Sequence, residues 1–115
     1  MKKIKDIQSA LTLFQEASIK QVEATEEGDY KTGNKSYDLI TKAAAYLKEE
    51  GAITELKPLL CNSSVGARLW AACYLLPVYE KESLSVLEQI AKGSGIYSLT
   101  AETTMSEWKK GSLNF

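Results

Sequence analysis

The sequence predicts an all-α protein, built as a short right-handed α-solenoid of about three antiparallel helix pairs. Apolar residues recur three and four positions apart along most of the chain, which is the spacing of a helix with one buried face. The most apolar stretch, residues 56–78, is divided by the polar turn at residues 62–64 and therefore predicts a helical hairpin. We expect residues 1–115 to form a single helical-repeat domain.

Two long helices are expected first. In each of them apolar residues recur at helical spacing on one face. Acidic residues crowd the end of the first helix, where they oppose the helix dipole, so this helix should stop there. Gly51 follows the second helix in the position where glycine commonly ends one. The expected limits are Lys3 or Asp6 to Thr25 for the first helix, and Thr32 or Asn34 to Glu50 for the second.

The second pair should consist of a short helix followed by a longer one. The short helix is expected over Ile53–Cys61, with Pro58 either marking its start or bending it. Ser63 or Ser64 should cap the longer helix. Because that helix is apolar on nearly all sides, we expect it to be the central one. Pro77 should then end or kink it.

The third pair is expected to repeat the plan of the second. Ser83 should cap its first helix, and the glycine-containing residues 92–95 should close it. The last helix should run from Tyr97 or Ser98 to Lys110. Three apolar residues of the second pair have apolar counterparts 31 residues further on, namely Leu56, Leu59 and Val65, matched by Leu87, Ile90 and Ile96.

A repeat of this length favours stacked helix pairs. A single pair cannot bury its apolar face alone and does so against its neighbours. The alternative is an irregular orthogonal bundle of the same helices.

Three stretches, residues 59–77, 85–91 and 99–111, resemble the small bacterial domain-of-unknown-function family numbered 2019. The resemblance is close in the C-terminal half and extends to the first fifty residues only in helix layout. It implies a HEAT-type helical repeat. It also implies an immunity protein that binds and blocks one toxin, since family members are often encoded beside toxin genes. This chain has Cys61 and Asn62 where the family usually has an acidic loop residue, so the resemblance carries over no fixed contact from that loop to Arg68.

The composition excludes several classes of function. A net charge of −1 argues against nucleic acid and anionic membranes as partners. The absence of histidine removes the usual general base and the usual metal ligand. No glycine-rich phosphate loop occurs. Cys61 and Cys73 are expected to be buried, inert thiols, the alternative being a redox or metal role. The sequence therefore nominates no catalytic, cofactor-binding or metal-binding residue and predicts a protein that is not an enzyme.

Nine residues are candidates for contacts with a partner. The acidic residues after the first helix either bind a basic partner or form an ordinary solvated helix end. Two aromatic residues four apart on the central helix either pack on a neighbouring repeat or form an outward binding patch. A neighbouring arginine is expected to make a specific structural or intermolecular contact. The candidates are Glu23, Glu26, Glu27, Asp29, Tyr30, Tyr37, Arg68, Trp70 and Tyr74.

The function that the sequence favours is a cytoplasmic protein-binding module of the immunity type. Its expected partner is another protein, such as a toxin domain, with no small-molecule substrate and no cofactor. The start of the chain lacks the apolar segment of a signal peptide, which favours the cytoplasm. We expect a monomer or weak dimer. The alternatives are a HEAT-like nucleic-acid-binding or glycosylase-type protein, and a structural or oligomeric subunit.

Overall fold

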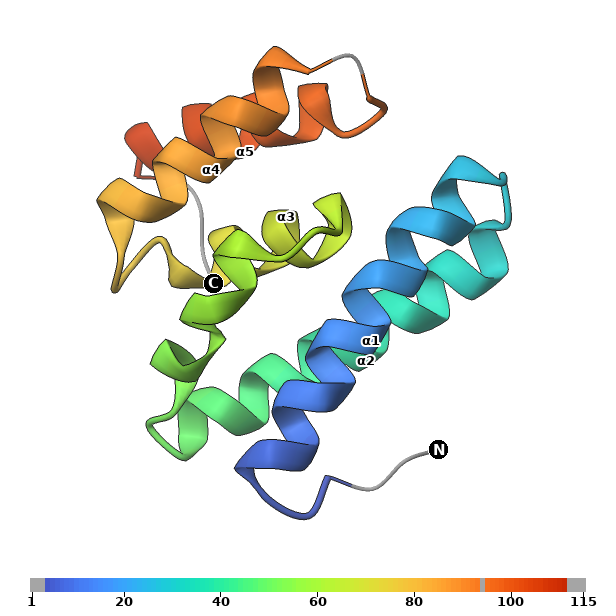
Figure 1. Ribbon diagram of the computed structural model, residues 1–115, viewed down its shortest axis with the longest axis vertical. Helices are drawn as coiled ribbons and strands as arrows, with labels where there is room; N and C mark the ends of the chain where they lie inside the picture. Colours follow the sequence, from blue (N-terminus) through green and yellow to red (C-terminus); the bar gives the residue numbers. More distant parts are fainter. Residues whose placement is uncertain (1–3, 94, 112–115) are drawn as a thin grey trace.

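Six helices make up residues 4–93 and 95–111, the part of the chain that the computed structural model describes, and this part contains no strand (Figure 1). The all-α prediction is therefore confirmed. The helices follow one another as three pairs, α1 with α2, η1 with α3, and α4 with α5. Their bounds are α1 Ile7–Glu26, α2 Tyr30–Glu49, η1 Ile53–Cys61, α3 Val65–Leu75, α4 Glu80–Lys92 and α5 Ser98–Lys109.

Aspartate side chains begin both helices of the first pair. Asp6 accepts a hydrogen bond from the backbone N–H of Ser9 at 2.8 Å, as predicted for a helix starting there. Asp29 accepts from the backbone N–H of Thr32 at 3.1 Å, so α2 begins at Tyr30, earlier than the sequence predicted. The pKa of the Asp6 carboxyl is lowered chiefly by the backbone hydrogen bond from Ser9, and that of Asp29 by hydrogen bonds from the side chain and then the backbone of Thr32.

The connection from α2 to η1 depends on a glycine. Gly51 has a φ of +68°, in the left-handed region that a side chain disfavours, and it turns the chain into η1. The predicted short helix over Ile53–Cys61 is confirmed and is wound as a 3₁₀ helix that contains Pro58. Its tight turns bury Leu56 and Leu60 against the other helices.

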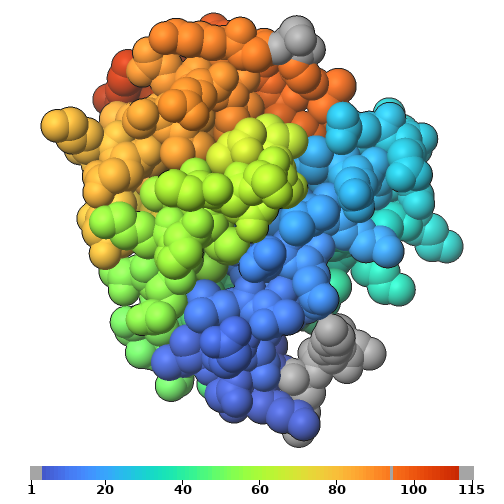
Figure 2. All heavy atoms as spheres, viewed as in Figure 1, coloured from blue at the N-terminus to red at the C-terminus, as the bar shows by residue number. Residues whose placement is uncertain are grey.

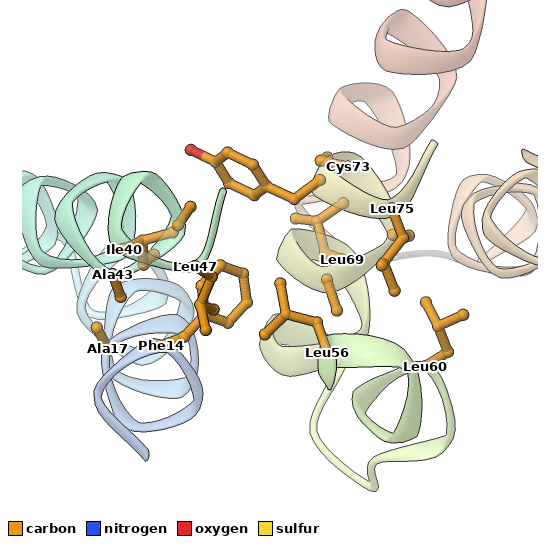
Figure 3. Packing of buried hydrophobic residues seen from close by; sticks show 14 of the residues in the cluster. Phe14, Ala17, Ile40, Ala43, Leu47, Leu56, Leu60, Leu69, Cys73 and Leu75 are labelled. Carbon is orange, nitrogen blue, oxygen red and sulfur yellow. The ribbon is translucent and has the colours of Figure 1, made fainter. Parts of the chain in front are cut away.

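Helix α3 lies at the centre of the molecule, as the sequence predicted. It packs against η1, α4 and α1, and most of its side chains are buried. Figure 3 shows Leu69 of α3 facing Leu56 of η1, and Phe14 of α1 beside Leu47 of α2. The core continues into the third pair, where Leu87 of α4 and Ala101 of α5 are fully buried.

The contact between α1 and α3 is unusually close at Gly66. A Cβ atom on this residue would lie 2.5 Å from the carbonyl oxygen of Ser18 and 2.8 Å from Cγ2 of Val22. Only a residue without a side chain fits there. Gly66 thus determines how near the first pair can come to the second.

The prediction that Ser83 caps α4 is wrong. The helix begins at Glu80, because the chain turns at residues 76–79, where the N–H of Tyr79 donates to the carbonyl oxygen of Leu75 at 2.7 Å. Glu80 and Glu82 in the first turn suit the positive end of the helix dipole. Ser83 therefore lies inside the helix, fully buried, and its hydroxyl has no hydrogen-bond partner among the described residues.

Helix α5 lies where the sequence placed it and packs against α4. Trp108 near its end donates from Nε1 to Oε2 of Glu80 at 2.6 Å.

The residues paired by the 31-residue repeat are buried to the same extent in one case and to different extents in another. Leu56 and its counterpart Leu87 are both fully buried, whereas Val65 is partly buried and its counterpart Ile96 is 55% exposed.

Replacing Ser83 with alanine should raise the free energy of unfolding by about 1 kcal/mol. The change removes a buried hydroxyl that lacks a partner and adds a better helix former. Thermal and urea unfolding measure the effect. The control is Ser85→Ala on the exposed face of the same helix, which gains only the propensity term. An equal gain in both variants would show that the hydroxyl of Ser83 costs nothing.

Candidate functional site

Two of the predicted aromatic residues touch across helices α2 and α3. The rings of Tyr37 and Trp70 are 5.6 Å apart between centroids, tilted by 59°, and Tyr37 is 42% exposed. Tyr74, one turn further along α3, is buried, and burial raises the pKa of its phenol. Its ring packs edge-on against Phe14 at 5.7 Å. Tyr74 thus belongs to the core, and Tyr37 with Trp70 forms its exposed margin.

Gln21, which sequence reasoning missed, joins all three helix pairs. Its Oε1 accepts hydrogen bonds from Nε1 of Trp70 at 3.2 Å and from the hydroxyl of Tyr97 at 3.0 Å. Its Nε2 donates to Oγ1 of Thr25 at 3.3 Å. A glutamine on an amphipathic helix carries no pattern that indicates such a role, since its partners are 49 and 76 residues away.

The predicted acidic residues lie in the last turn of α1 and in the connection to α2, and all of them are exposed. We call Glu23, Glu26, Glu27, Asp29 and Tyr30 the acidic corner. Asp29 has a structural task as the cap of α2, and the nearby Lys20 contributes to lowering its pKa. Tyr30 is 73% exposed. Of the two interpretations of these acids, the ordinary helix end therefore explains Asp29. The three glutamates and the exposed ring of Tyr30 remain candidates for contact with a partner.

A small cleft of about 210 Å³ brings Glu26 of the acidic corner together with another candidate, Arg68. It lies where the end of α1, the start of α3 and the residues before α5 meet. In Figure 2 the yellow-green start of α3 lies between the blue end of α1 and the orange residues of the third pair. We call it the inter-pair cleft.

Arg68 is held by the loop that precedes α3. Its Nη1 donates to the carbonyl oxygen of Asn62 at 2.7 Å. The side chain of Asn62 in turn accepts from the N–H of Ser64 at 2.8 Å, which fixes the loop. The contact from loop to arginine therefore uses a backbone carbonyl, which is why it does not need an acidic residue in the loop.

The expectation that both thiols are buried is wrong for Cys61. Cys61 is exposed, whereas Cys73 is buried. Burial raises the pKa of the Cys73 thiol to about 12, although a hydrogen bond with Thr104 lowers it in part.

A neutral thiol reagent at pH 8 should therefore modify Cys61 quickly and leave Cys73 unmodified. In denaturant both should react. Mass spectrometry of the labelled peptides measures this, and native labelling of Cys73 at the rate of Cys61 would contradict the burial.

Comparison of the chain with protein-family models, with curated proteins and with solved structures finds no match. The resemblance to the family of unknown function therefore stays a prediction. None of the helices in the described residues is long and apolar enough to cross a membrane. Residues 4–93 and 95–111 contain no cluster of three or more acidic or cysteine side chains that could hold a metal ion.

Proposed function

We propose that this chain is a protein-binding module that acts without catalysis, and that it neutralises a bacterial toxin as an immunity protein does. The observation that carries the proposal is the exposure of Tyr30, the most exposed large apolar side chain of the described residues. It lies at the acidic corner. An aromatic anchor within a polar rim is the composition found at protein interfaces.

The charge of the acidic corner supports a basic partner. Glu23, Glu26 and Glu27 are all exposed at the end of α1. Toxins that attack nucleic acids carry basic active clefts, because their substrates are polyanions. Acidic side chains on the binding module would speed the encounter with such a cleft and match its charge.

The order of the helix pairs supports a short right-handed solenoid of the HEAT type, which is part of the proposal. The first pair contacts the second through α1 and α3, and the second contacts the third through α3 and α4. Successive pairs in a solenoid contact their neighbours in this way and present an extended surface for a partner. We place the protein in the cytoplasm as a monomer or weak dimer.

Reversing the three glutamates Glu23, Glu26 and Glu27 to lysine together should slow association with the toxin and weaken its dependence on salt. Asp29 is left unchanged, because its loss would remove the cap of α2. The measurement is the association rate at two ionic strengths, using the toxin that the chain captures from its native host and whose activity it blocks. Circular dichroism checks that the fold is intact.

The control reverses three other exposed acids, Glu49, Glu50 and Glu55, and changes the net charge equally. A local interface requires that only the first variant lose its rate. Equal slowing of both variants would indicate that the net charge of the whole protein, and not a local interface, sets the association rate. Unchanged rates in both would remove the acidic corner from the interface. If no captured protein loses activity on binding, the immunity role is wrong even where binding is real.

A further inference from the structure

The walls of the inter-pair cleft are largely apolar, and among them Val65 is partly exposed and Ile96 exposed, whereas Val22 and Tyr97 are buried. Val22 of α1 and Val65 of α3 form one side, and Ile96 and the ring of Tyr97 form another. Ile96 is 55% exposed although it lies beside these apolar neighbours. A molecule in the cleft would therefore remove apolar surface from water without any change in the helices.

Two groups of opposite charge line the same cleft. Arg68 is positioned by its hydrogen bond to Asn62, and that bond uses one of the five N–H groups of a guanidinium. Glu26 is exposed on the α1 side. No ion pair joins Glu26 to Arg68 or to any other of the described residues. The charges of Glu26 and Arg68 are thus both available to pair with a bound molecule.

We propose that this cleft binds a small zwitterion with an aliphatic side chain, in the class of the apolar α-amino acids. The carboxylate would pair with Arg68, the ammonium group with Glu26, and the aliphatic side chain would lie on Val22, Val65 and Ile96. The cleft volume of about 210 Å³ is below that of sites for drug-sized ligands, roughly 300–1,000 Å³, so the occupant is small. Because Arg68 is already fixed, little ordering is needed on binding.

This inference goes beyond the proposed function and does not depend on it. The sequence alone predicted no small-molecule ligand, since Glu26 and Arg68 lie 42 residues apart and share no motif. Only the convergence of three helix pairs places them around one cavity.

The test is a titration of the isotopically labelled protein with L-leucine, followed by amide chemical shifts. Two analogues serve as matched probes, 4-methylpentanoate, which lacks the ammonium group, and 3-methylbutylamine, which lacks the carboxylate. We expect shifts at Val22, Val65 and Ile96, and an affinity for leucine at least about tenfold higher than for either analogue. Equal affinities for the three probes, or shifts absent from these residues, would overturn the proposal.

Variants then assign the two charges. Glu26→Gln should weaken leucine binding about tenfold and leave the binding of 4-methylpentanoate unchanged. The matched control is Glu27→Gln, an exposed acid next in sequence that does not line the cleft, which should change neither affinity. An equal loss in both glutamine variants would contradict a specific contact at Glu26. Arg68→Gln should weaken leucine and 4-methylpentanoate equally and spare 3-methylbutylamine; an unchanged affinity for leucine would overturn the carboxylate assignment.

Discussion

Replacing Gly66 with alanine is expected to lower the free energy of unfolding by roughly 2–3 kcal/mol, the cost of overpacking a close contact. The new methyl group would lie 2.5 Å from the carbonyl oxygen of Ser18, which belongs to the backbone of α1 and cannot rotate away. Helices α1 and α3 must then move apart and lose contacts on both sides. The better helix propensity of alanine, up to about 1 kcal/mol, offsets only part of this loss.

A matched control for Gly66 exists within α2. A Cβ atom at Gly33 would meet its nearest neighbour, Oγ1 of Thr25, at 3.4 Å, which is nearly an ordinary contact. Gly33→Ala should therefore leave stability unchanged or raise it by up to about 1 kcal/mol. Urea unfolding of both variants separates the two cases. If Gly66→Ala is as stable as the parent, the close crossing of α1 and α3 is wrong.

Truncating Leu69 to alanine should destabilise the protein by roughly 2–5 kcal/mol, and Leu76→Ala should do the same. Both side chains are fully buried, and Leu69 lies on the central helix where the first two pairs meet. The cost combines the lost burial of the removed atoms with the cavity they leave. Melting temperature and urea midpoint measure it.

The control for these leucines is Leu99→Ala. Leu99 is 69% exposed at the start of α5, so the same truncation should change stability by less than about 0.5 kcal/mol. A cost at Leu99 as large as at Leu69 would mean that α5 buries a face that the structure shows as open.

The helices could be predicted from sequence where local signals decide them. Asp6 caps α1, and Gly51 and Gly111 follow the second and last helices with positive φ, because these side chains act on the backbone beside them. The start of α4 could not be predicted in this way, since serine is a preferred N-cap residue and tyrosine is not, yet Tyr79 and not Ser83 precedes the helix. There the preceding turn at residues 76–79 determined the start.

The candidate site was predictable only in parts. Trp70 and Tyr37 could be named as candidates from the sequence, but whether Trp70 packs or faces outward stayed open, and their contact depends on how α2 lies beside α3. Gly66 could have been recognised from the sequence, because a glycine inside an apolar helix often has a packing reason such as the close approach of another backbone. Nothing local marks Gln21. Residues whose partners come from other helix pairs require the tertiary structure.

The shared acceptor on Gln21 has a consequence for how the protein opens. In stacked repeats each unit usually contacts only its neighbours, so a terminal unit can detach while the others stay folded. Here Trp70 and Tyr97, from the second pair and from the residue preceding the last helix, donate to one oxygen on the first. Detaching the last pair would break the hydrogen bond from Tyr97 to Gln21 and expose the buried ring of Tyr97 to water, which costs the burial of its apolar surface. The three helix pairs should therefore unfold together in a single cooperative transition, and not one pair at a time.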